Sequence, residues 1–169
     1  MATDKRYSLC PMNVSQRQAT SEDGMQIAAV LLSSKKAFLP YACAAHTDTE
    51  VQQWVRDTLV PSGSVTLACV DSLVVGVLAT STSSTVSWVD QLYLAPSHVG
   101  QCIGAQLLAH ALSTLPLPVR LYTFQENYRA RSFYERHGFR VVELTDGSAN
   151  EERCPDVLYE YGASIADGA

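Results

Sequence analysis

Apolar residues along this chain recur at two spacings, one typical of helices and the other of strands. The clearest helical stretch follows residue 102, where six apolar residues are separated by 4, 1, 3, 1 and 3 positions and form one stripe. Similar stripes predict helices over residues 20–39, 47–59 and 127–137, the second with Trp54 on its apolar side. Shorter apolar runs bounded by turn residues predict strands over 13–19, 64–70, 73–79, 85–94, 119–124, 139–144 and 156–161.

Cap and turn residues set the order of these elements. Thr47 and Glu50 have the spacing of a capping box, Asp71 and Ser72 are typical of a hairpin turn, and Gly138 is a typical helix stop. The order is strand-helix-helix-strand-strand-strand-helix-strand-helix-strand-strand. Its hairpins predict a mixed sheet covered by helices, an α/β or α+β fold. Residues 13–161 are expected to form one domain, with flexible termini at 1–12 and 162–169.

Composition and charge narrow the function classes. The chain has 169 residues, of which 47% are apolar and 17% charged, and this suits a packed core. Its 12 basic and 17 acidic side chains give a net charge of −5, which argues against a nucleic-acid partner. No apolar run approaches the roughly 20 residues of a membrane span, and the first residues lack the apolar core of a secretory signal. We therefore expect a cytoplasmic protein that does not contact membranes.

The cysteines and histidines do not predict a metal site. The five cysteines and four histidines are scattered along the chain without the spacing of metal ligands. Reduced thiols in a cytoplasmic protein explain the cysteines best.

A predicted strand, a short loop with Gly100 and a predicted helix near Gly104 follow one another directly. The first amide groups of a helix lack partners within the helix, and the helix dipole favours negative charge at that end. Such a loop is a typical site for an anion.

Two segments carry a resemblance to a known family. Residues 92–108 read LYLAPSHVGQCIGAQLL, and residues 127–139 read NYRARSFYERHGF. The second closely resembles the N-x-x-A-x-x-F-Y-E-x-x-G-F helix of the GNAT superfamily of acyl-CoA-dependent N-acetyltransferases, and the first resembles that family's acetyl-CoA segment.

The resemblance spans about residues 13–161 and implies a mixed, mostly antiparallel sheet of about six or seven strands with about four flanking helices. It also implies acetyl transfer from acetyl-CoA to an amine of a small molecule, peptide or protein, without a metal. A homodimer is a further expectation.

The first segment departs from the family pattern at two positions. Val99 stands where glutamine or arginine is usual and Cys102 where glycine is usual, whereas Gly104 matches. A cysteine costs about 1–2 kcal/mol if that position needs a positive φ, and little if it lies in the helical first turn. An alternative function is therefore an acyl-CoA-sensing or protein-binding module on the same fold. His98, beside Val99, is a hypothetical compensating donor to a phosphate.

The resemblance also implies roles for particular residues. Tyr134 matches the general acid that protonates the departing thiolate, although an aromatic residue here could also simply pack in the core. Asn127 matches a residue that fixes the cofactor arm, and its alternative role is a helix cap. The predicted cofactor-binding residues are Leu92, Tyr93, Leu94, Val99, Gly100, Gln101, Cys102, Ile103, Gly104, Ala105 and Asn127.

The general base and the acceptor site are predicted from position. Asp90, on the strand before Leu92, is the first candidate base, with His46 and Glu126 as alternatives. Tyr41 and His46, between the first two helices, are candidate acceptor contacts. The acidic loop over residues 147–156 is a second region that would attract a cation, although a solvated loop is the default.

Overall fold

The computed structural model describes residues 13–162, in which seven strands form one sheet with the order β1-β2-β3-β4-β5-β7-β6. Every neighbouring pair is antiparallel except β4 and β5, which are parallel. The predicted mixed, mostly antiparallel sheet is therefore confirmed. The predictions for residues 1–12 and 163–169 lie outside the described part. The strands are β1 (Val14–Gln18), β2 (Val65–Val70), β3 (Leu73–Thr82), β4 (Ser87–Leu94), β5 (Val119–Phe124), β6 (Arg140–Leu144) and β7 (Asp156–Tyr161).

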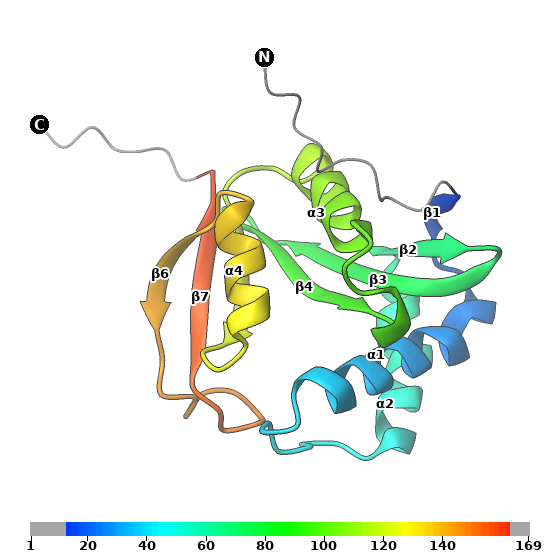
Figure 1. Ribbon diagram of the computed structural model, residues 1–169, viewed down its shortest axis with the longest axis horizontal. Helices are drawn as coiled ribbons and strands as arrows, with labels where there is room; N and C mark the ends of the chain where they lie inside the picture. The colour runs from blue at the N-terminus through cyan, green and yellow to red at the C-terminus, as the bar shows by residue number, and fades with distance from the viewer. Residues whose placement is uncertain (1–12, 163–169) are drawn as a thin grey trace, which may run out of the picture.

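Helices cover both faces of the sheet (Figure 1). The helices are α1 (Gly24–Phe38), α2 (Asp48–Trp54), α3 (Ile103–Thr114) and α4 (Tyr128–Arg136). On one face, Leu107 of α3 and Tyr134 of α4 pack with strand residues such as Leu78. On the other, Ile27 of α1 packs with residues such as Leu67. No helix within residues 13–162 is long and apolar enough to cross a membrane.

The second predicted helix differs from its expected form. Its capping box is present, with the Glu50 amide donating to Thr47 Oγ1 at 3.3 Å. However, residues 55–59 form a π-helical turn, and the buried stripe contains Val55 and Leu59. Trp54 is 39% exposed, so the expectation that it faces the core is wrong. The buried stripe is narrower than the apolar pattern suggested.

Strands β4 and β5 diverge along their length. They pair only at Ser87 with Val119 and at Trp88 with Arg120, although β4 continues to Leu94. In the β3–β4 ladder the register shifts, and Asp90 has no partner between its paired neighbours. Such a bulge bends and twists a strand. Residues 90–94 of β4 therefore lie beside an opening in the sheet rather than beside β5.

Candidate active site

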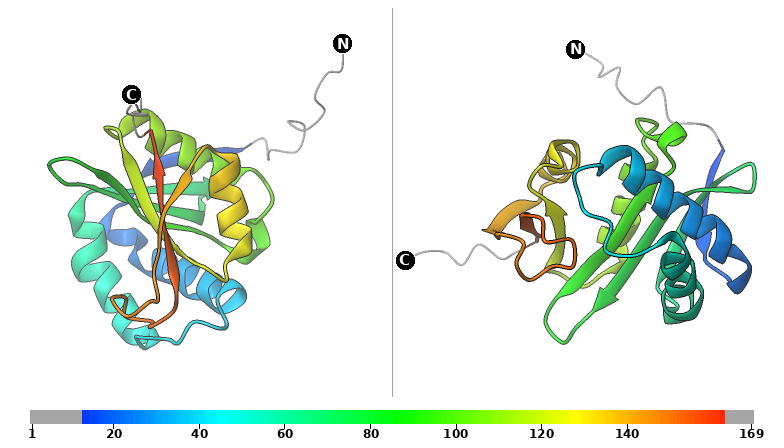
Figure 2. Two further views of the ribbon diagram at one scale, coloured as in Figure 1. Left: turned by 90° about the vertical axis from the view of Figure 1, so that its left-hand side faces the viewer. Right: turned by 90° about the horizontal axis from the view of Figure 1, so that it is seen from below.

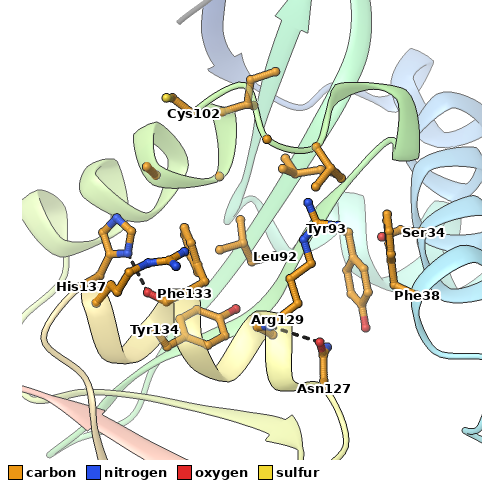
Figure 3. Close-up of a pocket in the computed structure, with 18 of the residues that line it drawn as sticks. Ser34, Phe38, Leu92, Tyr93, Cys102, Asn127, Arg129, Phe133, Tyr134 and His137 are labelled. Carbon is orange, nitrogen blue, oxygen red and sulfur yellow. Dashed lines mark hydrogen bonds between the residues drawn. The ribbon is translucent and has the colours of Figure 1, made fainter. Parts of the chain in front are cut away.

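A cavity of about 380 Å³ lies where α1, β4, the β4–α3 loop, α3 and α4 meet (Figure 3). We call it the α3–α4 cavity. Every predicted cofactor-binding residue lines it except Gln101, whose side-chain amide donates to the Ser97 carbonyl at 3.2 Å. The sequence motifs did not point to Ser34, Phe38 and Leu39 of the α1 region, which also line it. Only the folded sheet brings that region to the motif residues.

The loop before α3 has two left-handed residues. Gly100 has φ +83°, and Cys102, the N-cap of α3, has φ 62° and ψ 4°. Of the two alternatives for Cys102, the structure selects the strained one, which costs about 1–2 kcal/mol for a residue with a Cβ. The backbone turns there so that α3 begins at Ile103, one residue before its expected start.

Gly104 does not have a positive φ. A Cβ at this position would lie 3.4 Å from Leu94 Cδ1 and 3.6 Å from Phe133 Cζ, which are ordinary van der Waals distances. The first turn of α3 therefore lies against both β4 and α4, and this packing shapes the wall of the cavity.

Cations from α4 line the cavity in place of the arginine that the loop lacks. The Arg129 guanidinium carbon lies 5.4 Å from the Phe38 ring centroid, Arg136 lies about two turns further along the helix, and the imidazole of His137 follows it. His137 Nδ1 donates to the Phe133 carbonyl at 2.7 Å. No Asp or Glu of the described chain lines this cavity. His98 does not line it either, and its Nδ1 lies 2.8 Å from Ser97 Oγ.

A second cavity of about 460 Å³, the β4–β5 cavity, opens where the two strands diverge. Its lining has three carboxylates, Asp90, Glu152 and Asp156, against one cation, Lys35. Asp90 is exposed on β4, but partial burial raises the pKa of its carboxyl, and a hydrogen bond with the Ser81 side chain partly opposes this. Within residues 13–162, no three metal-ligating side chains form a group that would hold an ion.

Three polar side chains line both cavities: Tyr93, Asn127 and Tyr134. Tyr134 is 8% exposed, and its ring packs against those of Phe133 and Phe139. Burial raises the pKa of the Tyr134 phenol well above its usual value, so it stays protonated at neutral pH. Burial likewise raises the pKa of Tyr93 to about 12. Asn127 Oδ1 accepts from the Ala130 amide at 3.1 Å, which confirms the helix cap, and its place beside both cavities also suits a ligand contact (Figure 3).

The loops after α1 and after β6 run side by side (Figures 1 and 2). His46 Nε2 and Glu151 Oε2, 2.7 Å apart, join them. Tyr41 packs edge-on against Phe124, with centroids 6.3 Å apart, and burial with nearby Glu126 raises its pKa to about 12.

The structure brings fewer of the acceptor and base candidates together than the sequence suggested. Tyr41 and Glu126 line neither the α3–α4 cavity nor the β4–β5 cavity, and His46 lines a third cavity beside the α1–α2 loop. Of the three candidate bases, only Asp90 lines a cavity that Tyr134 also lines.

Comparisons with known proteins agree with this geometry. Residues 61–141 match the model of the acetyltransferase (GNAT) domain. Apo YjaB from Escherichia coli has a TM-score of 0.71 and 25% identity, covering 90% of this chain and 100% of that one. The PaiA N-acetyltransferase of Thermoplasma acidophilum, in complex with coenzyme A, has a TM-score of 0.70 and 24% identity, covering 88% and 98%.

A third structure is that of Arabidopsis thaliana Naa50 with the bisubstrate analogue CoA-Ac-MVNAL. It has a TM-score of 0.66 and 18% identity, covering 88% of this chain and 98% of that one. None of the curated protein sequences compared with the chain matches it. The matched domain, the shared fold and the two sequence motifs lead to one assignment: residues 61–141 are identified as an acetyltransferase (GNAT) domain.

Proposed function

We propose that this protein transfers an acetyl group from acetyl-CoA to the amine of a small molecule, or of a peptide or protein. The observation that carries the proposal is the meeting of two oppositely charged cavities at Tyr134, which lines both of them. An anionic donor suits the first cavity and a cationic amine the second.

The α3–α4 cavity suits the phosphates and the amide arm of acetyl-CoA. Backbone amides of residues 99–104 lie at the start of α3, where the helix dipole favours negative charge. Arg129 and Arg136 supply the positive charge that Val99 does not. On the side facing β5, the backbone of residues 90–94 has no strand partner, so it is open to the amides of an extended ligand.

Asp90 and Tyr134 each carry out one of the two proton transfers in the proposed reaction. Acetyl-CoA supplies the thioester, and a neutral amine forms the C–N bond as the C–S bond breaks. Asp90, directly or through a water, takes the proton that the amine must lose before attack. Tyr134 donates its phenolic proton to the departing sulfur. A backbone amide among residues 92–94 stabilises the charge that develops on the carbonyl oxygen.

The second candidate function is an acyl-CoA sensor, which the strained Cys102 and the valine at position 99 favour. Two measurements separate it from the enzyme: thermal stabilisation by CoA, and thiol release from acetyl-CoA with a panel of amines. The enzyme gives both responses. Stabilisation without thiol release supports the sensor, and the absence of both contradicts both functions.

The donor site has a test of its own. Arg136→Ala should weaken CoA binding by about 10- to 100-fold, because it removes a charge-assisted contact with a phosphate. Isothermal titration calorimetry with CoA measures the effect. Arg140→Ala is the matched control, because Arg140 is exposed on β6 and lines neither cavity. Equal affinities of the two variants would contradict the role of Arg136.

A further inference from the structure

We propose that the acceptor is a small diamine, in which one amine reacts beside Asp90 while Glu152 holds a second cationic group in the β4–β5 cavity. This inference rests on the proposed function. It narrows the acceptor from amines in general to compact molecules with two positive charges.

The first argument is that the carboxylates of the cavity differ in their hydrogen bonding within the protein. Asp156 is engaged within the protein, because it accepts from Asn150 Nδ2 at 2.9 Å and from the Thr145 hydroxyl. Glu152 is half-buried, and its carboxylate has no hydrogen bond or ion pair with any described residue. Such a carboxylate is available to pair with the cationic group of a ligand.

The nearby cation does not neutralise Glu152. Lys35 lines the same cavity, but its ammonium lies over the Tyr93 ring, 5.9 Å from the centroid. The charge of Glu152 also reaches β4, since it contributes to the raised pKa of Tyr93. Glu152 therefore faces the strand that carries Asp90, from the loop on the other side of the cavity.

The second argument concerns the apolar side chains of the same cavity. Leu39, Phe124 and the 52% exposed ring of Tyr122 line the cavity and suit a short hydrocarbon spacer. Trp88 stacks on Tyr122, with centroids 5.9 Å apart and ring planes 8° apart. Aromatic faces of this kind attract an adjacent ammonium group as well as methylene groups.

The third argument is the size of the cavity, about 460 Å³, which suits a small molecule. The α1–α2 loop lies beside the β6–β7 loop (Figure 2), and a hydrogen bond between His46 and Glu151 links them. Glu152, the next residue, is thereby held at the rim of a cavity of about 460 Å³. A compact molecule fits this volume without displacing the loops.

The reaction balances with the groups present. The reacting ammonium loses one proton to Asp90 and a second as the amide forms, and solvent takes up one of the two. The C–N bond forms, the C–S bond breaks, and the sulfur gains the proton of Tyr134, which the other amine proton restores. The second ammonium stays charged and paired with Glu152 throughout.

The test compares three acceptors of equal chain length in a thiol-release assay: 1,4-diaminobutane, 4-aminobutan-1-ol and 4-aminobutanoate. They differ at the far end, which is cationic, neutral or anionic. We expect kcat/KM to be about tenfold higher for the diamine than for the alcohol, after division by two for the two reactive amines of the diamine. We expect the lowest kcat/KM for the acid. Glu152→Gln should lower the diamine value about tenfold, to that of the alcohol.

Glu143→Gln is the matched control, because it removes the same charge from an exposed residue of β6 outside both cavities. Equal rates with the diamine and the alcohol, or a preference unchanged in Glu152→Gln, overturn the inference. Faster acetylation of a peptide amine than of diamines with three to six carbons also overturns it. If CoA binds but no amine of any class releases thiol, the proposed function itself fails.

Discussion

Glycine at position 102 should make the protein more stable than alanine at the same position. Both substitutions remove the thiol, but only glycine removes the Cβ that the left-handed backbone disfavours at φ 62° and ψ 4°. That conformation costs a residue with a Cβ about 1–2 kcal/mol. The greater freedom of glycine in the unfolded chain offsets about 0.4–1 kcal/mol. The free energy of unfolding of Cys102→Gly should therefore exceed that of Cys102→Ala by about 0.5–1 kcal/mol.

Urea unfolding followed by circular dichroism measures this difference, and thermal unfolding should show a shift of about 1–4 °C. Gly24→Ala is a control in which alanine, rather than glycine, is expected to give the higher free energy of unfolding. Gly24 has a right-handed φ of −50°, and a Cβ there meets nothing within 4 Å, so alanine should stabilise by about 0.4–1 kcal/mol. If Cys102→Gly is no more stable than Cys102→Ala while the Gly24 control behaves as expected, the left-handed loop is refuted.

Three further expectations concern the proposed catalytic groups and one partly buried ion pair. Tyr134→Phe keeps the ring packing and should lower kcat about 10²- to 10⁴-fold without raising KM for acetyl-CoA; full turnover would exclude the proton-donor role. For the wild type, kcat/KM should rise as Asp90 loses its proton, with a midpoint above the usual aspartate range because burial raises its pKa; a pH profile of Asp90→Asn that keeps this inflection would exclude Asp90 as the base. Asp23→Asn should lower the free energy of unfolding by about 2–3 kcal/mol at pH 7 by weakening the paired bonds from Arg17, at 2.7 and 2.8 Å. Because Arg17 lowers the pKa of Asp23, that stability is present above about pH 4 and is lost as the pH falls further, so urea unfolding at pH 3 should show a smaller difference.

Local signals in the sequence predict most of the architecture. The stripe after residue 102 becomes α3, and the capping box at Thr47 opens α2 where it was expected. Tyr134 and Asn127, taken from one motif, line both cavities. These predictions succeed because each depends on residues within one or two helical turns or one strand.

The features that define the two cavities depend on contacts between distant segments. The divergence of β4 from β5 follows from pairing over two residues only, which no local pattern indicates. Arg136 is one of several basic residues in a helical motif, and no local pattern distinguishes it from the others. Glu152 is likewise one of several acidic residues in a loop. The φ of Cys102 depends on how α3 docks against β4 and α4, so the sequence left both alternatives open. Only the folded structure places the basic side chains along one cavity and the acidic side chains along the other.

The separation of charge between the cavities also bears on how a turnover ends. Acylation turns the reacting ammonium into a neutral amide, because the amide group delocalises the lone pair that bound the proton. In the proposed mechanism, the attraction toward Asp90 that favoured entry is thus absent on exit, whereas CoA keeps its phosphates beside the basic side chains of Arg129 and Arg136. A diamine product keeps only the charge that pairs with Glu152, so electrostatics hold it less strongly than the substrate from which it was made.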